Sequence, residues 1–152
     1  MLKIYTQNYR LFKDSRHGIE RECLRVDKKG LLAMSAHPAS LGSALTNKFV
    51  TTDFSEAQLE LITPVCANEN AVLDSLMDLH LFVNESLDKN ELLWPFSMPC
   101  ELPKADKIPL AQYGNSREGQ RKTVYRHGLG LRYGRKMQTV SGIHYNFSFS
   151  EK

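Results

Sequence analysis

Acidic and amide side chains recur at every second position in several segments of this sequence. Glu20 and Glu22 form one such pair, and Glu56, Gln58 and Glu60 form a longer set. In a β-strand, residues two positions apart point to the same side, roughly 6.5–7 Å from one another. If these segments are strands, each therefore presents a polar face that is rich in oxygen ligands.

A third segment, near the end of the sequence, alternates most strongly. Its predicted polar face contains Gly142, His144, Asn146 and Ser148. The opposite face is apolar and consists of Ile143, Tyr145, Phe147 and Phe149.

If the three polar faces lie side by side, four carboxylates and a histidine converge. Such a cluster of like charges persists only where cations neutralise it. Carboxylate oxygens suit Mg²⁺ or Mn²⁺, and Mg²⁺ commonly arrives with a nucleotide phosphate. A half-exposed antiparallel sheet shows the same alternation without any site, so the pattern alone leaves both interpretations open.

The elements that would position these side chains follow from apolar periodicity and from turn residues. We expect strands over residues 19–26, 31–34, 51–65 (interrupted near Phe54-Ser55) and 140–149, and an extended segment over 94–100. We expect helices over residues 2–13, 39–46 and 117–136, the last interrupted at Gly128 and Gly130. A further long helix is capped by Asn68 or Asn70, with a buried stripe of Leu73, Leu76, Leu79, Phe82, Val83 and Leu87. Together they predict an α+β fold, a mainly antiparallel sheet with flanking helices on one side.

Composition narrows the class of protein. The 152 residues, 41% of them apolar and 24% charged, are typical of one globular domain, and no run of 18 apolar residues predicts a membrane span. No signal peptide is recognised, and three scattered cysteines indicate a reducing, cytoplasmic location. Between Arg117 and Lys136 seven basic residues face one acid, Glu118, which predicts either an anion-binding face or a solvated helix.

The same polar segments belong to seven runs that occur in order along most of the sequence. They are GIERE (18–22), LGSALT (41–46), TTDFSEAQLELITP (51–64), WPFSMPC (94–100), LAQYG (110–114), KTVYR (122–126) and MQTVSGIHYNFS (137–148). This series resembles the glutamate–cysteine ligases of proteobacteria. The resemblance implies that residues 1–152 are the N-terminal part of a longer catalytic domain whose C-terminal part is absent, so that this chain alone is inactive. Residues 115–120 depart from the family pattern.

The resemblance implies a glutamine-synthetase-like fold whose sheet forms one wall of a funnel, with ATP at one end and the amino acids at the other. It also implies residue roles: Glu20, Glu22, Asp53, Glu60 and His144 as the metal set, with Glu20 and Glu60 as catalytic candidates. The expected substrate contacts are Phe54 and Tyr125 for cysteine, with Arg126, Gln138 and Asn146 as further polar contacts.

The implied reaction has two steps. The γ-carboxylate of L-glutamate attacks the γ-phosphate of ATP to give an acyl phosphate, and the amine of L-cysteine then expels phosphate. Mg²⁺ (or Mn²⁺) and cationic groups matter most in the first step, because it brings two anions together. Which carboxylate takes the proton of the amine stays open.

Other functions also remain open. A ligase of the same superfamily with a different amine would show the same sheet and metals. A small module that binds nucleic acid through residues 117–136 would bind less tightly as salt rises and would not need Mg²⁺. The acidic strands argue against a nucleic-acid partner, because they would repel its phosphates. A folded remnant without catalysis is the third alternative.

Overall fold

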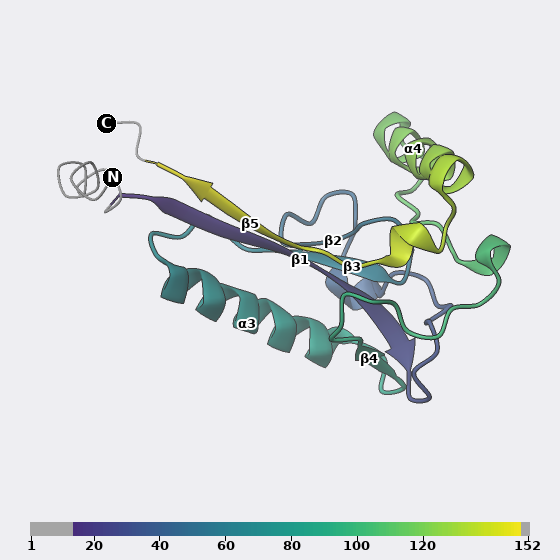
Figure 1. Cartoon of the computed structure of the whole chain (residues 1–152), viewed down its shortest axis with the longest axis horizontal. Helices are drawn as coiled ribbons and strands as arrows, with labels where there is room; N and C mark the ends of the chain where they lie inside the picture. The colour runs from purple at the N-terminus through teal and green to yellow at the C-terminus, as the bar shows by residue number, and fades with distance from the viewer. Residues whose placement is uncertain (1–13, 150–152) are drawn as a thin grey trace, which may run out of the picture.

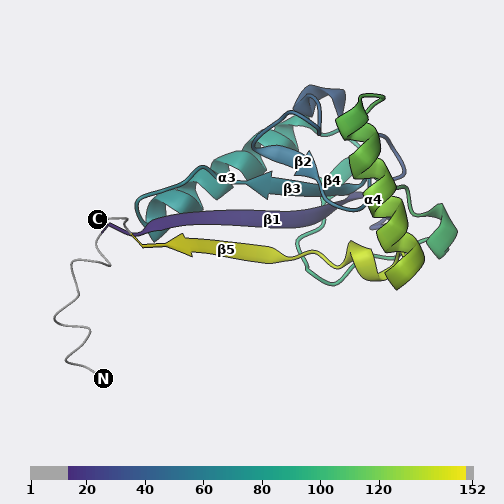
Figure 2. The same cartoon turned by 90° about the horizontal axis from the view of Figure 1, so that it is seen from above.

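The structure is a computed structural model and describes residues 14–149. It is an α+β fold with a single antiparallel sheet (Figures 1 and 2). The strands are β1 (Arg16–Asp27), β2 (Val50–Thr52), β3 (Gln58–Ile62), β4 (Glu91–Leu93) and β5 (Ile143–Ser148). The helices are α3 (Glu69–Ser86) and α4 (Arg117–Tyr133), and short 3₁₀ turns span Ala39–Leu41, Ala105–Lys107 and Met137–Thr139.

Strand β1 is the centre of the sheet because it pairs on both of its edges. One edge pairs with β3, whose other edge pairs with β2. The opposite edge is shared: its first half pairs with β5 and its last residues, Arg25–Asp27, pair with β4. All four pairings are antiparallel. The predicted antiparallel sheet is thus confirmed, with β1 as the element on which every other strand depends directly or through β3.

Helix α3 covers one face of the sheet (Figure 1). Asn68 caps it by accepting a hydrogen bond from the Ala71 N–H, one of the two caps expected. The predicted stripe is confirmed for four of its six residues: Val83 is fully buried, and Leu76, Leu79 and Leu87 pack against the core. Leu73 and Phe82 are 56% and 46% exposed, whereas Val72, which the stripe did not include, is fully buried.

Two apolar clusters lie on opposite faces of the sheet. Under α3, Val83 packs with residues of the strands and the turns, namely Cys23, Leu41, Val50, Leu59 and Leu61. On the other face, Leu24 and Val26 of β1 pack against a second group, namely Leu32, Ala33, Ala57, Cys100 and Ile108. The last half of β1 is therefore buried on both faces.

Several predicted elements are shorter than the sequence pattern indicated. Residues 31–34 form only isolated bridges, and residues 39–46 contain a single 3₁₀ turn. The expected strand over 51–65 is interrupted near Phe54-Ser55, as predicted, and forms the two short strands β2 and β3. The predicted helix over residues 2–13 lies outside the described residues.

The C-terminal third is closer to the prediction. Residues 94–100 contain no helix, as two prolines require. Helix α4 continues through Gly128 and Gly130, against the interruption that we expected, and its last residue is Tyr133. The C-cap residue Gly134 has φ +84°, a backbone angle that only a residue without a side chain adopts readily.

A buried arginine joins four segments at the end of β1. The Arg25 side chain is fully buried, and its guanidinium donates to a Glu91 carboxylate oxygen at 2.6 Å and to the Ser35 hydroxyl at 2.6 Å. It also donates to the carbonyl oxygens of Ser35, Ala36 and Glu56 at 2.9–3.1 Å. Arg25 thereby ties β4, the 35–36 loop and the turn before β3 to the central strand.

We predict that Arg25→Met destabilises the chain by about 3–5 kcal/mol, because Glu91 would keep a largely buried charge without a partner. Urea unfolding followed by circular dichroism measures the change. Arg121→Met is the matched control, since Arg121 forms an exposed ion pair with Glu118 and should leave the unfolding midpoint nearly unchanged. Equal losses of stability in the two variants would show that the contacts of Arg25 do not stabilise the fold.

Candidate functional site

Three carboxylates lie on the face of the sheet that α3 does not cover. Glu22 of β1 stands directly opposite Glu60 of β3 in the strand register, and Glu20 stands opposite His144 of β5. Directly opposed residues in antiparallel strands have Cβ atoms about 4.5–5.5 Å apart. The predicted convergence of the polar faces of β1, β3 and β5 is therefore confirmed for these four residues.

The fourth carboxylate is Asp53, which precedes the turn between β2 and β3. Burial, followed by the negative charges of Asp53, Glu20 and Glu22, raises the pKa of Glu60 to about 7, although the charge of Arg126 opposes the shift. Burial likewise raises the pKa of Asp53 and of Glu22, although Arg126 opposes the shift at Asp53 and the Gly142 N–H opposes it at Glu22. At Glu22 and Glu60 the neighbouring carboxylates thus destabilise the ionised form, which is the electrostatic condition that a bound cation relieves.

Glu56 does not belong to this cluster, contrary to the alternation in the sequence. Its carboxylate accepts the backbone N–H of His37 at 3.0 Å and that of Gln112 at 2.7 Å. The reason is that β3 begins only at Gln58, so the two-residue period does not extend back to Glu56. Glu56 instead joins two loops through these hydrogen bonds. The fourth carboxylate near Glu60 is therefore Asp53 and not Glu56.

Hydrogen bonds orient the carboxylates on β1. Glu22 accepts the Gly142 N–H at 2.8 Å, and the Gln58 amide lies at 3.4 Å from the same oxygen. Glu20 lies 3.3 Å from His144 Nδ1 and accepts from the Asn146 amide at 3.2 Å. The sequence placed Gln58 and Gly142 on the polar faces, but their contacts with Glu22 depend on the strand register and were not predicted.

The donors suit a hard divalent cation in chemical type, because they are carboxylate oxygens whose raised pKa values show unrelieved repulsion. Within residues 14–149, however, no three His, Cys, Asp or Glu side chains stand close enough to surround one ion. The carboxylates thus lie on one face but do not form a complete set of ligands around one position. The residues fit a divalent cation in charge and in the type of donor atom.

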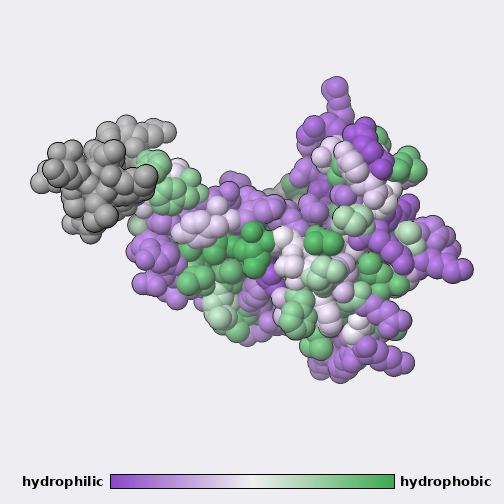
Figure 3. Space-filling view, in the orientation of Figure 1, coloured by the Kyte–Doolittle hydropathy of each residue, from purple (hydrophilic) through white to green (hydrophobic). Residues whose placement is uncertain are grey.

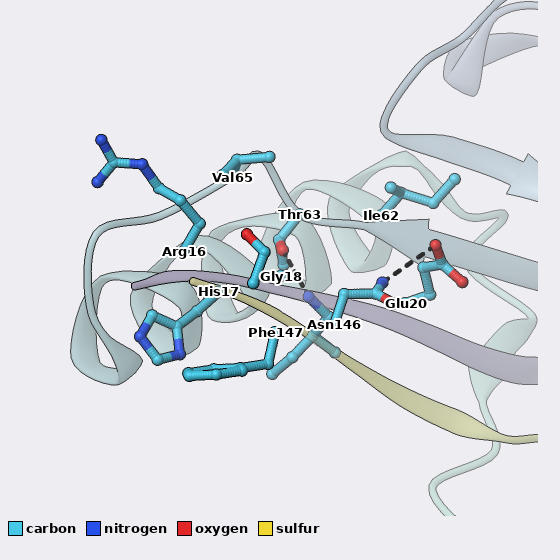
Figure 4. A pocket seen from close by; sticks show the side chains of 11 residues that line it. Arg16, His17, Gly18, Glu20, Ile62, Thr63, Val65, Asn146 and Phe147 are labelled. Carbon is cyan, nitrogen blue, oxygen red and sulfur yellow. Dashed lines mark hydrogen bonds between the residues drawn. The ribbon is translucent and has the colours of Figure 1, made fainter. Parts of the chain in front are cut away.

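A hollow of about 320 Å³ adjoins the cluster at the start of β1 (Figure 4). Gly18, Glu20, Thr63 and Asn146 line it, together with apolar side chains that include Ile62. Gly18 leaves room there, because a Cβ at this position would lie 3.8 Å from the Asn146 Cβ. Glu20 therefore belongs both to the hollow and to the carboxylate cluster.

Arg126 joins α4 to the segment that carries Asp53. Its guanidinium donates to the backbone carbonyls of Asp53 and Thr52, and it lies 4.6 Å from the centroid of the Tyr113 ring. The Tyr113 hydroxyl in turn donates to the Thr52 carbonyl at 2.6 Å. Tyr113 was not singled out by the sequence. We infer that Arg126 positions Asp53.

The remaining expected contacts lie around α4. Phe54 is 1% exposed, and the helix approaches it closely because a Cβ at Gly130 would stand only 3.3 Å from the ring. Tyr125 is 64% exposed on α4, and Gln138 lies half-buried in the 3₁₀ turn Met137–Thr139. In this structure Phe54 is therefore part of the packing under α4, whereas Tyr125 is open to a ligand.

We predict that Glu60→Gln stabilises the metal-free chain above pH 7. The pKa of Glu60 in the folded chain is about 7, above its ordinary value of 4.5. The contribution of Glu60 to the free energy of unfolding is therefore fully present below pH 4.5 and is lost as the pH rises through 7. The variant carries no charge at this position, so its stability should depend less on pH. Urea unfolding in EDTA between pH 5 and 8 measures the difference.

Glu85→Gln, an exposed change of the same chemistry on α3, is the control for this experiment. A Glu60→Gln variant that is less stable than the parent chain at pH 8 would contradict the repulsion described here.

We also predict that Arg126→Met destabilises the chain by about 1–3 kcal/mol, because two carbonyls lose a charged donor. Amide hydrogen exchange should become faster along α4 and at residues 52–54. Arg132→Met, on an exposed part of the same helix, should leave the exchange rates of α4 unchanged. If both variants behave alike, Arg126 does not fasten the helix.

Comparison with known proteins agrees with this geometry. The sequence model of the family described as glutamate-cysteine ligase matches residues 2–152. The glutamate–cysteine ligase of Pseudomonas entomophila is 55% identical over 150 residues, which are 99% of this chain and 28% of that protein. A glutamate–cysteine ligase of Leptospira interrogans is 54% identical over 138 residues, which are 90% of this chain and 26% of that protein.

Solved structures give the same result for the fold. A glutamate–cysteine ligase from Francisella tularensis, crystallised in complex with AMP, has a TM-score of 0.87 and 45% identity, and the match covers 90% of this chain and 27% of that one. A bifunctional glutathione synthetase from Pasteurella multocida also has a TM-score of 0.87, with 37% identity over 99% of this chain and 19% of that one. The chain spans little more than a quarter of the length of the curated relatives that it matches. With the family model matching nearly its whole length, the chain belongs to the glutamate–cysteine ligase family.

Proposed function

We propose that this chain is the N-terminal part of a catalytic domain that joins the γ-carboxylate of L-glutamate to the amine of L-cysteine with ATP, the first step of glutathione biosynthesis. The observation that carries the proposal is the cluster of Glu20, Glu22, Asp53 and Glu60, in which burial and the neighbouring negative charges raise the pKa of Glu60 to about 7. A ligase that brings a carboxylate to a polyphosphate needs cations at this point.

The hollow beside Glu20 supports a place for the nucleotide. It opens at the start of β1, and the cluster follows immediately along the same face. The relative from Francisella tularensis was crystallised with AMP, which agrees with nucleotide binding in the family. We place the nucleoside near Gly18 and Asn146, with its phosphates toward Glu20 and Glu60.

Glu20, Glu22, Asp53, Glu60 and His144 are the residues that would hold Mg²⁺ or Mn²⁺. The bound cation would neutralise phosphate charge and would let the glutamate carboxylate approach the γ-phosphate. Glu22 is held by the Gly142 N–H and Glu20 by Asn146, so both oxygens are oriented before any ligand enters. Such preorganisation lowers the cost of assembling the site.

The amino-acid end is assigned to the part of the face near Asp53 and α4. Tyr125 is exposed there and offers an aromatic ring and a hydroxyl group to the cysteine substrate. Arg126 keeps Asp53 in place, and Gln138 lies in the turn that precedes β5. Glu20 and Glu60 are the two catalytic candidates for the carboxylate that takes the proton of the amine.

The relatives have about three and a half times the length of this chain, so we expect the chain to bind ligand without turning it over. Among residues 14–149 no helix is both long and apolar enough to cross a membrane. A cytoplasmic location remains a prediction from the sequence.

We predict that titration of a nonhydrolysable ATP analogue into the chain gives heat of binding only with Mg²⁺ present, and that Glu60→Gln reduces the affinity at least about tenfold, since one of the cation's carboxylates is removed. Isothermal titration calorimetry measures both effects, and circular dichroism shows that each protein is folded. Glu85→Gln should bind like the parent chain. Binding that is independent of Mg²⁺, or unaffected by Glu60→Gln, would overturn the proposed site.

A further inference from the structure

Gln58 is a fully buried amide at the border between the carboxylate cluster and an apolar cluster. It is the first residue of β3, and its register partner on β1 is Leu24, the next residue after Glu22 on the same face of that strand. Leu24 packs in the apolar cluster with Ala57 and Ile108. Gln58 is 0% exposed, so its polar side chain has no access to bulk water. Such a side chain requires hydrogen-bond partners within the protein.

The nitrogen of the Gln58 amide reaches across the central strand. It lies 3.4 Å from the Glu22 carboxylate oxygen Oε2, from the Val140 carbonyl oxygen and from the Ser141 hydroxyl. A carbonyl and an ionised carboxylate only accept hydrogen bonds, so the nitrogen of the amide, and not its oxygen, suits this side. The distances are slightly longer than is usual for N–H···O bonds, as expected where two N–H groups serve three acceptors. Gln58 therefore ties β3 to the residues that precede β5, with Glu22 between them.

Gln58 and Gly142 together hold one oxygen of Glu22 and leave the other oxygen free. The Gly142 N–H donates to Oε2 at 2.8 Å, and the Gln58 amide approaches the same atom. Within residues 14–149 the second oxygen of Glu22, Oε1, accepts no hydrogen bond. Oε1 is therefore the atom that Glu22 can offer to a cation. Oε2 already accepts two N–H groups, which disfavours a bidentate contact through both oxygens.

The oxygen of the Gln58 amide is a second observation that points to a ligand. Gln58 Oε1 is buried and has no hydrogen-bond partner in the described part of the chain. An unpaired buried acceptor destabilises a folded protein. Because both atoms belong to one amide, this acceptor lies next to the Glu22 carboxylate. Mg²⁺ usually keeps several water molecules when it binds to a protein, and such waters are donors of the kind that this oxygen lacks.

A hydrated cation can reach the carboxylate cluster from solvent. The side chains of Glu20 and His144 are 35% and 59% exposed. Helix α4 lies on the same side of the sheet, and hydrophilic side chains predominate over it (Figure 3). The cluster is thus open to water on one side, and Gln58 and Leu24 close it on the other.

We propose that Gln58 is a positioning residue, which holds Glu22 as a one-oxygen ligand and thereby makes the carboxylate cluster select Mg²⁺ over Ca²⁺. Mg²⁺ is small and demands near-octahedral coordination, which single carboxylate oxygens and water supply. Ca²⁺ is larger and accepts bidentate carboxylates in irregular geometry. A Glu22 side chain that is free to rotate would offer both oxygens, which favours Ca²⁺. The inference rests on the proposed function for the presence of a cation, and it adds which residue sets the choice of cation.

Displacement of Mn²⁺ from the 152-residue chain measures this preference. Free Mn²⁺ gives an electron paramagnetic resonance signal that is lost on binding, and added Mg²⁺ or Ca²⁺ restores the signal as it displaces Mn²⁺. Gln58→Met keeps the length of the side chain and removes the amide. Its affinity for Mg²⁺ should fall about 10–100-fold, as is usual when a group that orients a metal ligand is lost. Its affinity for Ca²⁺ should stay within about twofold, because Ca²⁺ tolerates either arrangement of the carboxylate.

Gln120→Met is the matched control, because it makes the same chemical change at an exposed position of α4. Its affinities for both cations should equal those of the parent chain. Circular dichroism shows whether each variant is folded.

Nuclear magnetic resonance of the unmodified chain tests the same contact without a variant, and it decides the matter if Gln58→Met does not fold. Saturation with Mg²⁺ should shift the side-chain amide signals of Gln58 and leave those of Gln120 in place. Unshifted Gln58 signals would overturn the proposal.

The outcomes separate this inference from the proposed function. A loss of affinity that is confined to Mg²⁺ supports the role of Gln58. An equal loss for both cations shows that Gln58 only supports the fold, and this result overturns the inference, as does an unchanged ratio of the two affinities. A parent chain that binds neither cation overturns both the inference and the proposed cation site. A chain that selects Mg²⁺ through Gln58 but does not bind the ATP analogue counts against the proposed function alone.

Discussion

The opposition of Glu22 and Glu60 across two hydrogen-bonded strands is the constraint around which this structure is arranged. Like charges directly opposite one another destabilise a sheet, and here Asp53 and Glu20 add to the repulsion. The register holds because the other face of the same strands is fully buried under α3, with Leu59 and Leu61 at 0% exposure. Burial of roughly 25 cal/mol per Å² on that face offsets the electrostatic cost on this one. The sheet thus supports a charge arrangement that would not persist in an isolated hairpin.

Segments outside the strands complete the arrangement through polar contacts with backbone. Arg25 holds the turn at Glu56, and Arg126 holds Thr52 and Asp53, so both ends of the short segment between β2 and β3 are fastened by a guanidinium. Arginine suits this task because its planar group donates several hydrogen bonds in fixed directions. The position of Asp53 beside Glu60 therefore depends on two arginine side chains that lie outside the carboxylate cluster itself.

The sequence predicted the structural features that follow from the periodicity of apolar and polar residues and from local chemistry. The alternation in β5, the pairing of Glu20 with Glu22 on one face and the Asn68 cap are local properties, and all three are confirmed. Glu56 was misplaced because the start of β3 is set by a turn packed against Pro109 rather than by its own residues. Leu73 was placed in the core because it lies three residues before Leu76, which packs on the core, but its own side chain is 56% exposed. The contacts of Arg126 and Tyr113 with Thr52 and Asp53 join residues 60 positions apart or more, which no local pattern predicts.

The character of one face of β1 changes along its length, and this change gives the candidate site a direction. Near Gly18 the face borders an open hollow, at Glu20 and Glu22 it carries charge, and at Leu24 and Val26 it is sealed by an apolar cluster. A polar ligand can therefore lie along the first half of the strand but cannot continue past Glu22. Asp53 adds its charge beside these carboxylates and is held by Arg126 of α4. At the carboxylates, charge and access therefore coincide on this face.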